Sequence, residues 1–226
     1  MPAARRPAAA PKARRPEPGA DGDTEARILA AAHAVFVRRG TAGARMQEIA
    51  AEAGVNHALL HYYFRSKQQL ADAVFRGVAA RLLPPVLEAL LSDAALEDKV
   101  RRVIALELEV LAESPYLPGY LVSELGHHPE RVGQLVRAVT GREVGDLGAH
   151  LRARLGPQLA AGAADGTLRP VAVDQFVANL LSLCFFPFAA RPLLGAVLGF
   201  DDAGFRAFVD RRREELPAFF LAALRP

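Results

Sequence analysis

The sequence predicts an all-α fold, and three observations support this class. Ala and Leu dominate the 226 residues, and apolar side chains recur at spacings of three and four, as they do on one face of a helix. No segment alternates β-branched and polar residues in the manner of a half-buried strand. The pair Asp165-Gly166, which could close a β-hairpin, lies between two helical patterns. We therefore expect helices throughout the chain.

The first predicted helix starts near residue 23 and ends at Gly40. Asp23 or Thr24 can cap its start, because both side chains accept hydrogen bonds from the free amides of a first turn. Gly40 suits its end, where a left-handed backbone is common. The stripe expected to be buried consists of Ile28, Ala31, Ala32, Val35 and Phe36.

Two shorter helices are predicted on either side of Gly54, where a left-handed turn costs least. Asn56 can cap the second of the pair. Leu60 and Phe64 should face inward on this helix. Two short helices around one glycine, the second with a polar cap, are typical of a helix-turn-helix unit. Its outward residues should be His57, Ala58, His61 and Tyr62.

A fourth helix is predicted from Ser66, because Ser66 and Gln69 form a capping box. It should end near Leu83, where Pro84 and Pro85 remove two backbone donors. The residues from 162 to 166 are typical of a turn. Further helices are expected over 85–91, 95–113, 115–126, 129–163 with an interruption near residue 141, 171–189 and 201–224.

The charge is distributed unevenly along the chain. Residues 1–67 hold 11 Lys and Arg and 6 Asp and Glu, a net charge of +5. The remainder holds 17 basic and 19 acidic residues, a net charge of −2. A basic module on a slightly acidic body suggests contact with nucleic acid. Residues 1–20 are mostly Ala, Pro, Arg and Lys, so we expect a disordered basic tail. That tail either follows DNA phosphates or only keeps the protein soluble.

Several classes of function are disfavoured by the composition. The single Cys184 excludes an internal disulfide and should be a small core residue. The longest uncharged run, between Gln175 and Arg191, is too short for an ordinary membrane span, so we expect a cytoplasmic protein without a membrane segment. No Gly-rich phosphate loop or nucleophile elbow is present, so no enzyme, cofactor or metal site is predicted. The acidic residues Glu107, Glu109 and Glu113 should lie on a solvated face.

Residues 24–70 resemble the DNA-binding domain of the tetracycline-repressor (TetR) family of bacterial transcriptional regulators. The resemblance is carried by the stretch from Gln47 to Asn56 and by the stretch from Leu60 to Lys67. The ordered set Gly54, Val55, Tyr63, Phe64, Ser66 and Lys67 is specific at this spacing. The resemblance implies a tail over 1–20, a helix-turn-helix domain over 21–67 and a helical ligand-binding and dimerisation domain over 68–226.

The resemblance also implies roles for individual residues. His57 and Ala58 stand where family members reach into the major groove, and His61 where an aromatic residue touches bases or backbone. Tyr63 and Lys67 stand at phosphate-binding positions. Gln47 stands at a position expected to contact the DNA backbone or a base. Arg45 replaces the usual Ser or Thr cap, and either meets a phosphate or is solvated. The full predicted set is Arg45, Gln47, Asn56, His57, Ala58, His61, Tyr62, Tyr63 and Lys67.

A recognition helix reads few base pairs, so tight binding requires a homodimer on a palindromic operator, with the two helices about 34–36 Å apart. The expected dimer residues lie on helices that a partner would cover, or that form a purely intramolecular core: Phe176, Leu180, Leu183, Phe205, Phe208, Leu216, Phe219 and Phe220. The family usually releases DNA on binding a small molecule. The candidate pocket residues are Leu106, Val110, Tyr116, Tyr120 and Phe185, although such side chains more often form core than a ligand wall.

The leading hypothesis is therefore a repressor of transcription that an unknown small-molecule effector releases from double-stranded DNA. An alternative is an activator, or a helical adaptor that uses the same helix-turn-helix unit to bind protein. The adaptor predicts no affinity for DNA and no effect of Lys67 on it.

Overall fold

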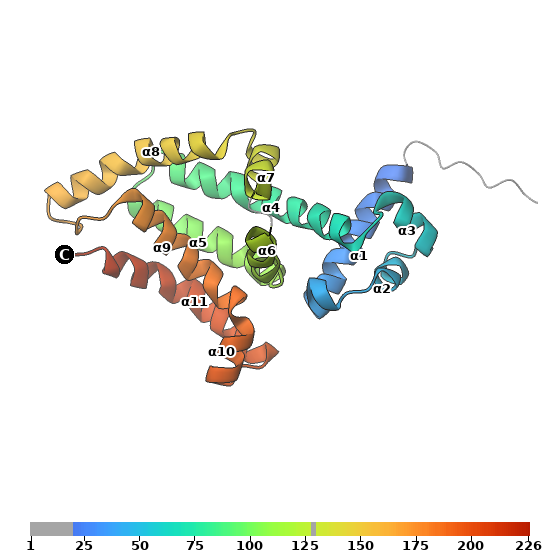
Figure 1. The fold of residues 1–226 in the computed structure, drawn as a ribbon. Coiled ribbons are helices and arrows are strands. Elements are labelled where there is room, and N and C mark those ends of the chain that lie inside the picture. The colour runs from blue at the N-terminus through green and yellow to red at the C-terminus, as the bar shows by residue number, and fades with distance from the viewer. Residues whose placement is uncertain (1–19, 128–129) are drawn as a thin grey trace, which may run out of the picture.

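The computed structural model describes residues 20–127 and 130–226 (Figure 1). These residues form eleven helices and no strand, so the predicted all-α class is confirmed. The predicted disordered tail lies outside the described residues, except for Ala20 at the start of the first helix.

The first three helices form a small unit at one end of the molecule (Figure 1). They are α1 (Ala20–Gly43), α2 (Met46–Glu52) and α3 (His57–Tyr63). Gly40 interrupts α1 with φ 67°, as its predicted role at a helix end requires. The start of α1 differs from the prediction, since Asp23 lies inside the first turn rather than ahead of it. An Asp at this position still stabilises the helix, because its negative charge is attracted to the positive, N-terminal end of the helix dipole.

A separate hydrophobic core holds this unit together. It includes the whole predicted stripe of α1 and extends to Leu70, Ala71 and Val74, which lie beyond the boundary predicted after Lys67. The start of α4 (Lys67–Leu91) thus belongs to the N-terminal packing unit, and the rest of α4 leads into the body.

The predicted end of the fourth helix at Leu83 is wrong. Helix α4 continues through Pro84 and Pro85 to Leu91, so the separate helix expected over 85–91 does not exist. Each proline lacks an amide donor but has a backbone φ compatible with a helix. Val86 and Leu90 follow the prolines and are buried in the core of the body. That burial offsets the two missing hydrogen bonds.

Seven helices complete the body and pack around a second core (Figure 1). They are α5 (Leu96–Glu113), α6 (Leu117–His127), α7 (Glu130–Thr140), α8 (Val144–Ala164), α9 (Val173–Ala189), α10 (Arg191–Leu198) and α11 (Asp202–Ala223). The prediction missed α10, because this short segment contains Pro192 and Gly195 and has no long apolar period. The predicted turn at 162–166 begins later than expected, since α8 runs to Ala164.

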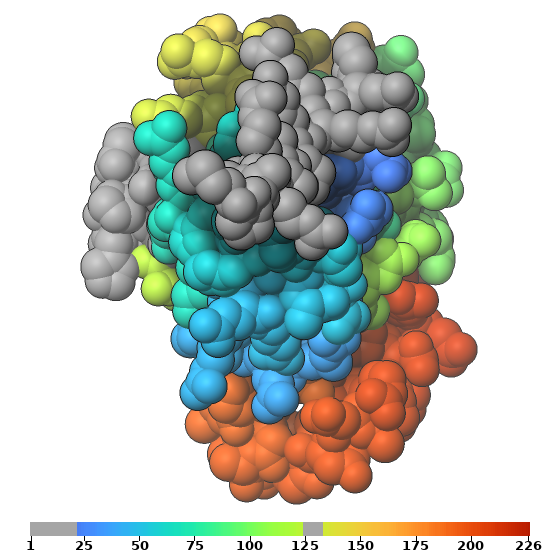
Figure 2. Space-filling model, turned by 90° about the vertical axis from the view of Figure 1, so that its right-hand side faces the viewer, coloured from blue at the N-terminus to red at the C-terminus, as the bar shows by residue number. Residues whose placement is uncertain are grey.

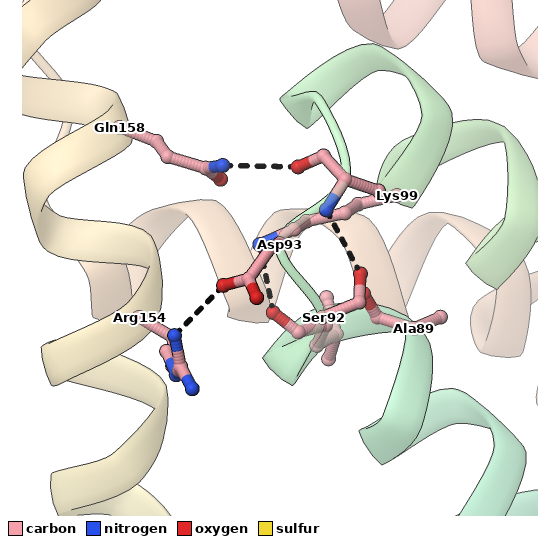
Figure 3. Close-up of polar contacts among 8 residues, drawn as sticks. Ala89, Ser92, Asp93, Lys99, Arg154 and Gln158 are labelled. Carbon is pink, nitrogen blue, oxygen red and sulfur yellow. Dashed lines mark hydrogen bonds and ion pairs between the residues drawn. The ribbon is translucent and has the colours of Figure 1, made fainter.

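Side chains of α5 and α8 bind the C-terminal end of α4 and the loop that follows it (Figure 3). Lys99 of α5 is only 1% exposed and donates its Nζ to the Leu90 carbonyl at 3.1 Å. From α8, Arg154 binds the Asp93 carboxylate at 2.8 Å and Gln158 donates to the Ala94 carbonyl at 2.9 Å. Burial lowers the pKa of Lys99, although the nearby Asp93 opposes this shift. A cation at the C-terminal end of α4 also complements its dipole.

Within the described parts of the chain, no single helix combines the length and apolarity of a membrane span. Helices α9 and α10 reach that composition only together, and their axes are bent by 70°.

Candidate nucleic-acid interface

The turn between α2 and α3 has the geometry of a helix-turn-helix. Gly54 has φ 64°, and the amide of Val55 donates to the Ala50 carbonyl at 3.0 Å. The side chain of Asn56 accepts from the amide of Leu59 at 2.8 Å, so the predicted cap of α3 is present. Local sequence alone therefore determines where α3 begins.

Helix α3 has one buried and one exposed face. Leu60 is fully buried, and Phe64 is buried just after the helix ends. His57 and Ala58 are exposed, and Tyr62 is 75% exposed. Figure 2 shows the N-terminal unit, coloured blue to cyan, on the face turned toward the viewer. The helix thus offers polar and aromatic side chains to a partner.

The other predicted contacts surround this face. His61 is half-buried, and its ring centroid lies 4.3 Å from that of His57. Tyr63 is half-buried and packs edge-on against Tyr62, with ring centroids 5.4 Å apart. Gln47 is exposed near the start of α2. Tyr63 also packs against the hydrophobic core of the N-terminal unit, which fixes its position relative to α1 and α4.

Arg45 is the residue before α2 and makes no side-chain cap. Its side chain is exposed. The hydroxyl cap that the family often has here is therefore absent, as the sequence indicates.

Lys67 has partners that the sequence did not predict. Its Nζ donates to the carbonyl oxygens of Ala42 at 2.9 Å and Ala44 at 3.2 Å, just beyond the kink in α1. Two of the three ammonium donors are thereby used within the protein. Lys67 thus holds the end of α1 against the start of α4.

The capping box of α4 also forms, with one difference. Ser66 Oγ accepts from the amide of Gln69 at 3.2 Å, as predicted. Gln69 reaches back to the amide of Arg65 at 3.1 Å. The start of α4, which follows α3 closely in the chain, is therefore well defined.

Sequence reasoning missed the arginines of α1 that tie this helix to the helix-turn-helix unit. Arg27 donates to the Ala53 carbonyl at 2.8 Å, and Arg38 binds the Glu52 carboxylate at 2.9 Å. No local pattern identifies them, because their partners lie far away in the sequence.

Two residues predicted for the ligand pocket lie next to the N-terminal unit. Tyr116 and Tyr120 are at the junction between the N-terminal unit and the body, packed against the N-terminal core. Tyr116 contacts the rings of His33 and Phe36 of α1. The prediction treated both tyrosines as part of the body, but large aromatic side chains fill the space between the two helical units.

Polar contacts strengthen this junction. Tyr120 Oη donates to Asp72 Oδ1 at 2.6 Å, and Gln68 Nε2 donates to Tyr120 Oη at 3.0 Å. His33 Nε2 lies 2.8 Å from the Ser114 hydroxyl. Burial, and secondarily the charge of Arg81, lower the pKa of His33.

The remaining predicted pocket residues pack around the core of the body. Val110 is buried, whereas Leu106 and Phe185 are half-buried. One described cavity lies between α4 and α7 and has a volume of about 660 Å³. It is lined by Pro84, Leu87, Glu88, Leu91, Ser92, Asp93, Val139, Thr140 and Arg142.

The expectation that Glu107 is solvated is wrong. Glu107 is 7% exposed, and burial raises the pKa of its carboxyl to about 8. The thiol of Cys184, from α9, lies beside this carboxyl and partly opposes the rise of its pKa. Cys184 is fully buried, as predicted for a small core residue. Burial together with the neighbouring Glu107 raises the pKa of the Cys184 thiol, so the thiolate is disfavoured.

Most residues predicted for the dimer interface are inside the chain's own core. Phe176, Leu180, Phe205, Leu216 and Phe220 are all at most 4% exposed in the single chain. Apolar periodicity cannot distinguish a core face from a partner face, because both are apolar.

Three members of that predicted set do reach the surface. Phe219 of α11 is 63% exposed, while Leu183 of α9 and Phe208 of α11 are half-buried. They line one groove of about 280 Å³ together with Arg211, Arg212, Glu215 and Leu216.

An all-helical body joined to a helix-turn-helix unit defines a DNA-binding regulator. The family model for "Bacterial regulatory proteins, tetR family" matches residues 28–74. The HTH-type transcriptional repressor Rv3405c of Mycobacterium tuberculosis is 36% identical over 138 residues, which are 61% of this chain and 70% of that protein. The chain belongs to the TetR family.

Further relatives agree with this assignment. The repressor NicS of Pseudomonas putida is 29% identical over 190 residues, covering 83% of this chain and 86% of NicS. The ketosteroid regulator KstR2 of Mycobacterium tuberculosis shares the fold at a TM-score of 0.60 and 18% identity, covering 89% and 95% of the two chains. The haemolysin II regulator HlyIIR shares the fold at a TM-score of 0.55 and 23% identity, covering 91% of this chain and 98% of HlyIIR. The chain is therefore a DNA-binding regulator of transcription.

Proposed function

We propose that the chain acts as a homodimeric repressor that binds a palindromic operator with two α3 helices and leaves it when a small molecule binds the body. The exposed face of α3, set between the caps Asn56 and Ser66, carries this proposal. His57 and Ala58 contact bases, while Tyr63 and Lys67 bind phosphates. Gln47, His61, Tyr62 and Arg45 border the same surface.

The proposed dimer uses the exposed side of α9 and α11. Phe219 and Phe186 are 63% and 56% exposed, and a partner that covered them would remove this apolar surface from water. Two copies joined through this face would present two α3 helices, as a palindromic operator requires. Operator DNA is cytoplasmic in bacteria, so the protein acts there.

The proposed effector must bind the DNA-binding and the released states of the dimer with different affinities. A ligand with equal affinity for both states would not change their populations. The cavity between α4 and α7 supports an effector, because one of its walls is the helix that continues into the N-terminal unit. A hundredfold loss of operator affinity requires about 2.7 kcal/mol of differential binding.

The proposal is tested by selecting duplexes from a random library with the full-length protein and then measuring binding by fluorescence anisotropy. We expect enrichment of a palindrome and a stoichiometry of two chains per duplex. No enrichment, together with weak binding to every duplex, would instead favour the adaptor. A reporter gene placed behind the selected duplex distinguishes repression from activation.

A further inference from the structure

Arg27 joins the first helix to the turn of the helix-turn-helix unit. Its Nη2 donates to the carbonyl oxygens of Ala53 at 2.8 Å and Gly54 at 3.4 Å. Both carbonyls lie just after the last turn of α2, where no amide of a further helical turn can donate to them. The guanidinium supplies those donors and places a positive charge at the negative end of the α2 dipole.

The turn held by Arg27 leads directly into α3. Gly54 has φ 64°, and only Val55 and Asn56 separate it from His57. Asn56 is the cap of α3, so its backbone position sets the direction in which the helix leaves the turn. A displaced Gly54 carbonyl would therefore displace the exposed start of α3.

Two further arginines of α1 bind side chains of α2 and do not touch this turn. Arg38 pairs with Glu52 at 2.9 Å and Arg39 with Glu48 at 3.6 Å, and these partners are side chains of α2. Such exposed pairs contribute little to stability. Arg38 is thus a natural control, since it also links α1 to α2 but leaves the turn carbonyls alone.

We propose that Arg27 is a positioning residue for DNA recognition: it holds the turn so that α3 enters the major groove in one orientation. This inference rests on the proposed role of α3. The Arg27 guanidinium donates to backbone carbonyls of the turn and so acts on α3 through the turn. It therefore contributes to discrimination between sequences rather than to general attraction for DNA.

The experiment compares full-length wild type, Arg27→Ala, Arg27→Lys and Arg38→Ala on two duplexes of equal length. One duplex is enriched from a random library by the wild type, and the other has a random sequence. Binding is measured over a series of salt concentrations. Stoichiometric titration gives the active fraction of each variant, so partial misfolding does not alter the ratio of the two affinities.

Arg27→Ala should lose about tenfold in affinity for the enriched duplex, roughly the effect of one lost base contact. Its affinity for the random duplex and its salt dependence should stay at the wild-type values. Arg27→Lys should recover part of the loss, because an ammonium can still donate to one of the two carbonyls. Arg38→Ala should remain within about twofold of wild type on both duplexes.

Two outcomes would overturn the positioning role while leaving DNA reading by α3 intact. The first is wild-type affinity of Arg27→Ala for the enriched duplex. The second is an equal loss on both duplexes with a salt slope smaller by about 1, which would make Arg27 a phosphate contact. Failure of the wild type to enrich any duplex would instead overturn both this inference and the proposed function.

Discussion

Tyr120 of α6 donates a hydrogen bond to Asp72 of α4 at 2.6 Å, and this contact joins the body to the first half of the connecting helix. Gln68 donates to the same phenol oxygen at 3.0 Å. Gln68 directly follows Lys67, so a motion of α6 would be transmitted to the start of α4 beside the reading face. The contact therefore provides a physical route between the body and the proposed DNA surface.

Tyr120→Phe should lower the free energy of unfolding by about 1–2 kcal/mol, because Asp72 loses its short hydrogen bond. Urea denaturation followed by circular dichroism measures this change. Tyr62→Phe is the control, since Tyr62 is 75% exposed and should change stability by less than about 0.5 kcal/mol. Equal effects of the two substitutions would show that the Tyr120 hydroxyl contributes nothing to the junction.

Glu107→Gln should make stability less dependent on pH. The folded carboxyl has a pKa of about 8, above its ordinary value of 4.5, so between these values the folded chain retains a proton that the unfolded chain releases. The contribution of this group is thus complete below about pH 4.5 and is lost as pH rises to 8, by an amount on the order of 5 kcal/mol.

The measurement for Glu107 is urea denaturation between pH 5 and 9. Glu107→Gln should be more stable than wild type at the alkaline end, and the gap should close toward the acidic end. Glu109→Gln is the matched control on the exposed side of α5. A parallel pH dependence of wild type and Glu107→Gln would contradict the assigned pKa.

His57→Ala should change which bases the protein prefers. His57 is exposed at the start of α3, where a side chain of a recognition helix reaches base edges. Repeating the duplex selection with the variant measures this preference. The exposed His150 of α8 provides the control, and His150→Ala should retain the wild-type preference. A uniform loss of affinity, with the preference unchanged, is the result that would remove His57 from base reading.

Lys67→Ala should have two separable effects. Loss of a phosphate contact should flatten the dependence of log affinity on log salt by about 1. Loss of the hydrogen bonds to Ala42 and Ala44 should lower the free energy of unfolding by about 1 kcal/mol. Salt titrations and urea denaturation measure the two separately. A lower stability with an unchanged salt slope would mean that Lys67 only holds α1 against α4.

Phe219→Glu should weaken the dimer, because it places a charge in the proposed apolar interface. Sedimentation velocity over a range of concentrations should show more monomer than wild type, and operator affinity should fall accordingly. Val122→Glu is a suitable control, since Val122 of α6 is 57% exposed and lies outside the groove of α9 and α11. If both variants dimerise like wild type, the interface lies elsewhere.

Sequence patterns predicted the features whose causes are local. Gly54 marks the turn, Asn56 caps α3 and Ser66 caps α4, because each acts on backbone within a few residues. The same locality explains why most helices were predicted. The body was harder to interpret, since an apolar stripe indicates burial but not what covers it. Phe220 is covered by the chain itself, whereas Phe219 is open to solvent.

The sequence by itself determined the all-α class, the helix-turn-helix unit and the exposed face of α3. Only the tertiary structure decided the roles of residues whose partners are distant in the chain. Lys67 turns to the end of α1, Tyr120 binds α4, and Glu107 is buried beside Cys184. The reason is physical: caps and turns depend on neighbouring backbone, whereas burial and long-range hydrogen bonds depend on how the helices pack.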